Sequence, residues 1–275
     1  MKSRGPTLTQ VISAQRGQGR VKAVTSLDDD VFVLRSKNQQ VEVYDAVSCK
    51  LQRHISVSGL GDHSNGLAAC AHYKCLYVSD SDWGHENLHR VELIGSNEVM
   101  KWSVDGDPTG LSVNKEHNVV VTCAGADKLQ EYTTHGSLVR EICLQAGATD
   151  PWHAVQLSSG EYVVSLYTSQ VVVSVVGLDG HVRRSYGRSH THVGRMKHSR
   201  CLAVTKNDDI LVADHGNDRI LSINSSLSSI QELVLPIDGG IQRPRGLCLD
   251  ESLGRLYVGE FGGRCRVLVL DNVKL

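Results

Sequence analysis

The stretch Arg183–Arg200, RRSYGRSHTHVGRMKHSR, contains six basic residues and three histidines but no acidic residue. Clustered cationic side chains attract phosphate and carboxylate groups whatever the net charge of the whole chain. We therefore predict a ligand-binding loop, and the residues assigned to it are Arg183, Arg184, Arg188, Arg195 and Lys197. The alternative is a solvated loop without a ligand. The spacing of its histidines matches no standard metal site, so no metal is predicted.

A second chemical pattern is His85-Glu86-Asn87-Leu88-His89, which matches the HExxH motif of zinc proteases. That motif needs a helix, because only a helix places both histidines on one face with the glutamate near the metal-bound water. Here the pattern lies in a stretch that aligns with a turn and strand elsewhere in the chain. No nucleophile elbow, P-loop or dinucleotide fingerprint is visible. We predict no catalytic residue and no cofactor.

Acidic and basic residues also recur at short spacing around predicted turns. Acids end the second strand of several units, at Asp80, Asp214 and Glu260. Bases begin the third strand, at Arg90, Lys128, Arg219 and Arg266. We interpret them as ion pairs that fasten the turn rather than as a ligand site, because they belong to the repeating unit itself.

These residues are positioned by a repeating unit of short strands. Arg243–Leu270 contains three apolar runs with period-2 alternation, separated by glycines and charged turns. The same order of parts recurs about every 45 residues, which indicates a propeller or a solenoid. Counted from Leu247, the equivalent positions are Leu202, Ala154, Leu111, Leu67 and Ala23. Repeats made of strands alone favour the propeller.

The repeats predict an all-β, six-bladed β-propeller with four-stranded antiparallel blades, spanning residues 1–275 as one domain. The inner strands are expected to start near residues 21, 65, 109, 152, 200 and 245. The last unit lacks a fourth strand, and Thr7–Ser13 is an unused strand near the N-terminus. We therefore expect residues 7–13 to close the last blade, which would also remove a free sheet edge.

The motifs P-x-G-L, L-x-V-A-D and N-x-R-I resemble the NHL repeat. In the fifth copy they correspond to Leu202, to Leu211-Val212-Ala213-Asp214 and to Asn217-Asp218-Arg219-Ile220; in the last copy they include Pro244, Gly246 and Leu247. The resemblance implies an interaction module of the kind found in tripartite-motif ubiquitin ligases, which binds protein or RNA. The family also includes a zinc lyase. The chain lacks RING, B-box and coiled-coil patterns, so it resembles the receptor part alone.

Residues just before each inner strand are expected to surround the mouth of the central channel. They are Val21, Asn65, Thr109, Trp152, Arg200 and Arg245, with Arg243 close by. Trp and Arg are common anchors in interfaces. We therefore predict a ligand-binding rim formed by Trp152, Arg200, Arg245, Arg243 and Asn65. The fourth copy departs from the repeat, because Trp152-His153-Ala154 replaces x-Gly-Leu and Ser165-Leu166 replaces the terminal acid.

The net charge of −1 gives no overall preference for nucleic acid or membranes. The eight cysteines form no CxxC pair, as expected for buried thiols of a cytoplasmic protein. No apolar stretch suggests a signal peptide or a membrane span. We predict a monomeric, non-catalytic module that binds a protein segment on one face and neither DNA nor membranes. Single-stranded RNA binding and a channel-centred metal-dependent hydrolase or lyase are the alternatives.

Overall fold

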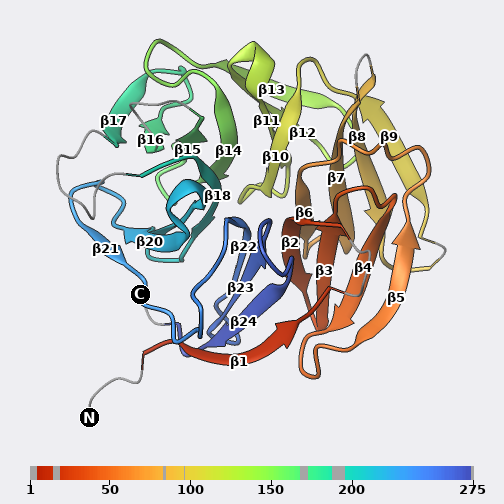
Figure 1. Ribbon diagram of the computed structural model, residues 1–275. Coiled ribbons are helices and arrows are strands. Elements are labelled where there is room, and N and C mark those ends of the chain that lie inside the picture. Colours follow the sequence, from red (N-terminus) through yellow and green to blue (C-terminus); the bar gives the residue numbers. More distant parts are fainter. Residues whose placement is uncertain are drawn as a thin grey trace.

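The period-2 runs of the sequence form a ring of six sheets. The computed structural model describes residues 5–14, 19–82, 85–95, 97–167, 173–187 and 196–273. They form six four-stranded antiparallel sheets around a central axis (Figure 1). The predicted fold class is therefore confirmed. The helical segments in the described residues are the 3-10 turns η1 (Ala124–Ala126) and η2 (His215–Asn217), and none is long and apolar enough to cross a membrane.

In the first three blades, four consecutive strands run from the axis outward. Blade 1 contains β2 (Val21–Leu27), β3 (Asp30–Arg35), β4 (Gln40–Asp45) and β5 (Leu51–Ser56). Blade 2 contains β6 (Leu67–Cys70), β7 (Cys75–Asp82), β8 (His85–Glu92) and β9 (Val99–Ser103). Blade 3 contains β10 (Pro108–Val113), β11 (Val119–Cys123), β12 (Lys128–Tyr132) and β13 (Leu138–Cys143).

The second half of the ring continues this order. Blade 4 contains β14 (Pro151–Gln156), β15 (Tyr162–Leu166), β16 (Val173–Val176) and β17 (Val182–Tyr186). Blade 5 contains β18 (Ser199–Val204), β19 (Ile210–Asp214), β20 (Arg219–Ile223) and β21 (Ile230–Glu232). Blade 6 contains β22 (Pro244–Asp250), β23 (Arg255–Glu260), β24 (Val267–Asp271) and, as its outer strand, β1 (Thr7–Ile12).

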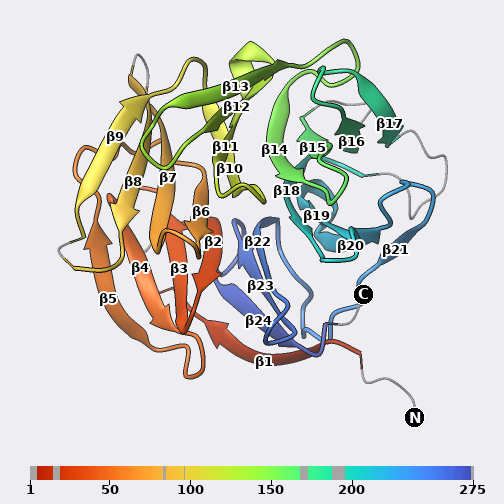
Figure 2. The same cartoon turned by 180° about the vertical axis from the view of Figure 1, so that it is seen from behind.

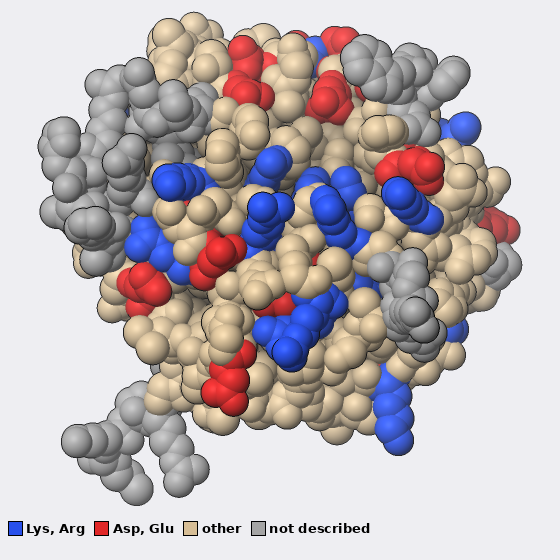
Figure 3. Space-filling view, in the orientation of Figure 1, with Lys and Arg blue, Asp and Glu red and all other residues tan. Residues whose placement is uncertain are grey.

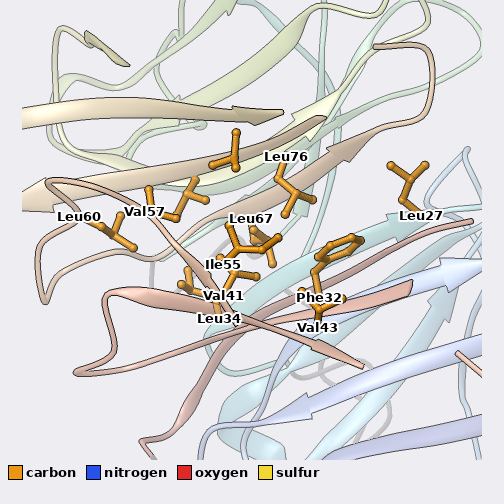
Figure 4. Close-up of a cluster of buried hydrophobic side chains, with 12 residues drawn as sticks. Leu27, Phe32, Leu34, Val41, Val43, Ile55, Val57, Leu60, Leu67 and Leu76 are labelled. Atoms are coloured by element: carbon orange, nitrogen blue, oxygen red, sulfur yellow. The ribbon is translucent and has the colours of Figure 1, made fainter. Parts of the chain in front are cut away.

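The hydrophobic core lies between neighbouring blades. Figure 4 shows one such cluster, in which Phe32 and Leu34 of blade 1 pack with Leu67 and Leu76 of blade 2. Middle strands are buried on both faces, so they read as continuous apolar runs, as in Val119–Cys123. Each fully buried Val, Leu or Phe side chain contributes about 1.5–3 kcal/mol. Inter-blade packing is therefore the main force that holds the ring.

The N-terminal strand β1 closes the ring, as predicted. It pairs antiparallel with β24, from Thr7 opposite Asp271 to Ile12 opposite Val267. Figure 2 shows from behind that β1 runs along the outside of β24. The Ile12 side chain is buried and joins the core cluster between blades 6 and 1. Strands from both ends of the chain thus belong to one sheet.

Five of the six inner strands contain a β-bulge near their start. Their registers shift between Val21 and Ala23, Pro108 and Gly110, Pro151 and His153, Ser199 and Leu202, and Pro244 and Gly246. A bulge leaves its extra residue outside the ladder and re-aims that side chain. The re-aimed residues are Lys22, Thr109, Trp152, Arg200 with Cys201, and Arg245. Bulges are therefore the elements that present side chains to the axis.

The predicted turn ion pairs form in blades 5 and 6. Arg219 Nε lies 2.8 Å from Asp214 Oδ2, and Arg266 Nε lies 2.7 Å from Glu260 Oε2. Blade 1 carries the reversed pair: Arg35 ends the second strand and lies 2.7 Å from Glu42, with both side chains fully buried.

Blades 2 and 3 depart from that pattern. In blade 2 the hairpin is longer, so that Asp80 stands opposite Asn87, and Arg90 pairs with Glu92 at 3.0 Å. In blade 3 Cys123 replaces the acid, and Lys128 bonds Asp105 and Glu141. The pairing of Asp80 with Arg90 expected from the repeat was wrong, because the longer hairpin places Asn87 opposite Asp80 and Tyr77 opposite Arg90.

Candidate functional site

The bulge residues meet around the axis at one end of the central channel. The channel has a volume of about 290 Å³, and its lining includes Lys22, Asn65, Thr109, Trp152, Arg200 and Arg245. One residue expected at the channel mouth was wrong: Val21 is fully buried in the core between blades 6 and 1, and Lys22 lines the channel instead. The register explains the error. Val24 opposes Val33 in blade 1 as Leu247 opposes Val258 in blade 6, so Val24, not Ala23, is the equivalent of Leu247.

Arg245 is the most enclosed cation of the mouth. Its side chain keeps only 7% of its exposure, and its Nη2 atom donates a hydrogen bond of 2.8 Å to Asn65 Oδ1. Its guanidinium carbon lies 4.6 Å from the centre of the Phe261 ring and 5.4 Å from that of Trp152. Cation–π contacts and one neutral amide oxygen therefore hold this charge.

Arg200 lies beside Arg245 on the same tryptophan. Its guanidinium carbon is 3.8 Å from the centre of the Trp152 ring and 4.6 Å from that of Tyr167. Its Nε atom is buried and has no hydrogen-bond partner. The bulges of β14 and β18 bring Trp152 and Arg200 together, because these two strands lie in neighbouring blades.

Lys22 completes the set from blade 1. Its Nζ atom donates to Asn65 Oδ1 at 3.1 Å, the same oxygen that accepts the hydrogen bond of Arg245. It also lies 5.7 Å from the centre of Phe261, over which Arg20 stacks at 4.9 Å. Asn65 thus orients two cations without neutralising either. We call Lys22, Asn65, Trp152, Arg200, Arg245 and Phe261 the mouth site.

The mouth site carries an excess of positive charge. Among the described residues, no ion pair involves Lys22, Arg200 or Arg245. Burial, followed by repulsion from Arg245, Arg200 and Arg20, lowers the pKa of Lys22 to about 8. Burial and Arg200 lower the pKa of Arg245 to about 9. Both remain charged at neutral pH, although burial and mutual repulsion disfavour the charged forms.

Neighbouring ionisable groups do little to compensate the positive charge of the mouth site. Burial and Arg200 lower the pKa of His215 to about 4, which keeps this imidazole neutral. Burial and Asp127 raise the pKa of Asp150, a half-buried carboxyl that interacts with Arg200. Figure 3 shows Lys and Arg side chains gathered around the middle of this face, with most acidic side chains further out. An anion entering the mouth would therefore relieve charge repulsion as well as form hydrogen bonds.

The three described residues of the predicted basic loop, Arg183, Arg184 and Lys197, do not line the channel mouth. Arg183 and Arg184 belong to the outer strand β17, where Arg183 Nη2 lies 2.7 Å from Asp179 and Arg184 Nη2 lies 3.3 Å from Glu161. Lys197 is exposed, and its backbone N–H donates to Asp214 Oδ1 at 2.7 Å. Arg188 and Arg195 lie outside the described residues. Two of the five predicted loop residues thus pair with acids at the outer edge of blade 4.

Arg243 lies next to the mouth site rather than in it. It lines a neighbouring hollow of about 380 Å³ together with Arg20, Asp218 and Phe261. Its backbone N–H donates to Asp218 Oδ1 at 2.6 Å, and its side chain packs against Gly262. Phe261 forms a shared wall between this hollow and the channel mouth.

The sequence reasoning missed Lys22, Phe261 and Tyr167. Phe261 lies in the turn after β23 and Tyr167 directly follows β15, so both come from turns between the second and third strands of a blade. These turns emerge on the same face as the starts of the inner strands. A signal was present, because Phe261 is one of only two phenylalanines in the chain and stands at a turn rather than in a strand.

His153, the irregular residue of blade 4, has a structural role. It is fully enclosed, and its Nδ1 atom accepts a hydrogen bond of 3.2 Å from the backbone N–H of Leu202. Its Nε2 atom therefore carries the hydrogen and donates to the Leu111 carbonyl at 2.9 Å. One side chain thus links the inner strands of blades 3, 4 and 5. The position cannot deliver a proton to a ligand, since burial lowers its pKa and both nitrogens are occupied.

The HExxH segment forms part of strand β8, as its alignment with another blade indicated. The His89 side chain is buried, with its Nε2 atom 3.8 Å from Asp80 Oδ2. Among the described residues, no group of three or more His, Cys, Asp or Glu side chains is arranged to hold a metal ion. The chemistry that the mouth site offers is anion recognition by hydrogen bonds and charge.

No family model matches the sequence, and no curated protein matches it. Solved structures with a similar fold include virginiamycin B lyase from Staphylococcus aureus, at 12% identity and TM-score 0.70 over 97% of this chain and 99% of that chain. A protein of unknown function from Bacteroides thetaiotaomicron has 9% identity and TM-score 0.74 over 94% and 70%. Kuenenia stuttgartiensis hydrazine synthase has 17% identity and TM-score 0.66 over 94% and 78%. These similarities extend to the fold alone, which enzymes and other proteins share.

Proposed function

We propose that this propeller is a non-catalytic binding module whose mouth site recognises an acidic segment of a partner protein. The observation that carries the proposal is the convergence of Lys22, Arg200 and Arg245 without a carboxylate partner among the described residues. Burying cations without an anion is costly, and a structural role alone does not require three of them at one point. A ligand carboxylate would supply the missing charge.

The aromatic rings of the mouth favour a protein segment over single-stranded RNA. RNA-binding surfaces stack bases on open aromatic faces. Here Arg200 covers Trp152, while Arg20 and Arg245 both lie over Phe261. Tyr167 is also engaged, because it stacks on His198 with ring centres 4.7 Å apart. Because arginine side chains already cover these aromatic rings, the rings orient the positive charges and are not free to stack on bases.

The NHL-like motifs support the same proposal. In this interpretation the chain serves as the recognition part of a larger assembly, for example as a substrate receptor for a ubiquitin ligase. The mouth face would hold the partner, while the outer strands and the opposite face remain available for other components. The proposal does not depend on the NHL assignment, because it rests on the charges of Lys22, Arg200 and Arg245.

The proposal can be tested with a pooled library of acidic octapeptides in a fluorescence-anisotropy assay. We expect binding by the native chain and at least a tenfold loss in Arg245→Met, since a hydrogen-bonded charge pair contributes about 1.5–3 kcal/mol. Arg53→Ala is the matched control, because Arg53 is an exposed cation on the outer strand β5 that pairs with Asp30. Its affinity should match that of the native chain.

Three results would overturn the proposal. They are the absence of acidic-peptide binding at low salt, equal losses in the two variants, and tighter binding of a poly-uridine oligonucleotide than of any acidic peptide. Thermal denaturation provides the folding control. Arg245→Met should be at least as stable as the native chain, because it removes a buried charge that no carboxylate compensates.

A further inference from the structure

The mouth site is small and closed on several sides. Its channel volume of about 290 Å³ lies at the lower end of the range for small-molecule sites. Trp152 and Phe261 stand on two sides of Arg245, which is itself almost completely buried. A polypeptide that crosses the mouth must keep its backbone above these rings. A chain end needs room for only one strand of backbone and can enter along the axis.

The donors available there suit a planar anion with two oxygens. Arg245 uses Nη2 on Asn65, and the fork of a guanidinium offers further N–H groups for a carboxylate. Arg200 has a buried Nε without a hydrogen-bond partner. Lys22 Nζ has one assigned acceptor and three hydrogens to donate. Side chains from three separate strands, β2, β18 and β22, therefore bring cationic donors to the same channel mouth.

The channel is narrow beside the cations, because several small residues line it. Glycines occupy one position on each of three inner strands or their starts, at Gly66, Gly110 and Gly246. Ala23 and Cys201 lie on two others. A Cβ would lie 2.8 Å from Leu111 Cγ at Gly66, 2.5 Å from the Trp152 carbonyl oxygen at Gly110 and 3.0 Å from Val24 N at Gly246. These glycines therefore let the inner strands of neighbouring blades pack closely beneath the cations.

From this geometry we propose that the mouth site is a receptor for the free C-terminal carboxylate of a partner polypeptide. The inference rests on the proposed function, because it names the group that supplies the acidic charge. It differs from that function in requiring the end of a chain rather than an internal aspartate or glutamate.

Three synthetic octapeptides of a common sequence test the proposal. The first ends in Gly-Ala with a free carboxylate, the second is its C-terminal amide, and the third is the amide with an internal Glu-Glu pair. Affinity would be measured by isothermal titration, and the Arg200 and Arg245 Nε–H signals would be followed by NMR. We expect the free acid to bind at least tenfold more tightly than either amide and to shift both arginine signals.

Two variants test whether the difference in affinity between the free acid and the amides arises at the mouth site. Arg200→Lys retains a cation but lacks the fork, so it should lose most of the preference for the free acid, whereas Arg53→Ala should retain it. Equal binding of the free acid and the two amides would overturn the terminal-carboxylate proposal and leave recognition of acidic segments intact. Preference for the internal Glu-Glu peptide would do the same. Failure of all three peptides and of the acidic library would overturn both, and competition by millimolar phosphate alone would indicate an oxyanion site without chain-end selectivity.

Discussion

At the scale of single residues, Lys22 shows how burial changes the properties of a common surface side chain. It is half-buried, shares an acceptor with Arg245 and faces only cations and one amide. Its pKa of about 8 places its titration near physiological pH, whereas an exposed lysine titrates near 10.5. The charge of the mouth site is therefore sensitive to mild alkali.

Lys22 predicts a pH dependence of ligand binding. A bound carboxylate favours the protonated amine, so binding should be independent of pH below about 7. Above the free-state pKa of about 8, binding must take up a proton, and affinity should fall by up to about tenfold per pH unit. Isothermal titration between pH 6 and 9.5 would measure this.

The groups that face Lys22 are Arg245, Arg200 and Arg20, which all carry positive charge, together with neutral Asn65. Lys22→Arg is the control below pH 9, because it replaces the amine that titrates near 8 with a guanidinium, while the Arg245 pKa of about 9 affects both proteins above that pH. Its affinity should decline much less over the same interval. A native affinity that stays constant up to pH 9.5 would contradict the assignment.

At the scale of strands, bulges and blades decide which side chains reach the axis. The positions of Asn65, Trp152, Arg200 and Arg245 could be predicted, because repeat period and strand pattern determine the start of each inner strand. The position of Lys22 could not be predicted. Ala23 and Val24 are both apolar, so either of them fits the repeat as the equivalent of Leu247. A single shift in a strand exchanges the buried and the exposed side chains.

Longer loops limited the prediction in a different way. Composition showed that Arg183 and Arg184 are basic, but it could not show that Asp179 and Glu161 lie close enough to pair with them. Phe261 was missed because its role depends on Arg20, which is distant in sequence, as well as on Arg245 of its own blade. Contacts between blades depend on the ring as a whole, and no local pattern reports them.

His153 provides a prediction at the scale of strands. His153→Gly introduces the glycine found at this repeat position in blades 2, 3 and 6 but removes two hydrogen bonds between inner strands. We expect a loss of about 2 kcal/mol in the free energy of unfolding at pH 7.5, measured by urea denaturation.

The same residue sets a pH trend. The lowered pKa keeps His153 neutral in the folded state, while the unfolded chain protonates it below about pH 6.5. Its contribution is complete above that pH and declines as pH falls. The native chain should therefore lose more stability between pH 7.5 and 5 than His153→Gly does. Parallel losses in both proteins would show that His153 is not the titrating group.

At the scale of the whole molecule, the pairing of β1 with β24 closes the ring. Removal of residues 1–12 would delete β1, expose the edge of β24 and open the core around Ile12. Because loss of a buried Ile side chain alone costs about 2–5 kcal/mol, we expect a clear fall in the midpoint of thermal unfolding and a tendency to aggregate.

A matched control is deletion of residues 1–4, which precede β1 and should leave the midpoint unchanged. Calorimetry and light scattering would follow the two truncations. A truncation of residues 1–12 with native stability would contradict the closure role of β1.

The register of the β1–β24 pair has a mechanical consequence. Thr7 and Asp271 are paired at one end of the β1–β24 ladder, so the polypeptide leaves both strands from the same end. Tension applied between the two chain termini would load these hydrogen bonds one after another and would peel β1 away at low force, instead of shearing the whole ladder at once. Blade 6 would lose its outer strand first, and blade 6 supplies both Arg245 and Phe261 to the mouth. If the chain were tethered at both ends, stretching would therefore act directly on the blade that holds the most buried cation of the mouth site.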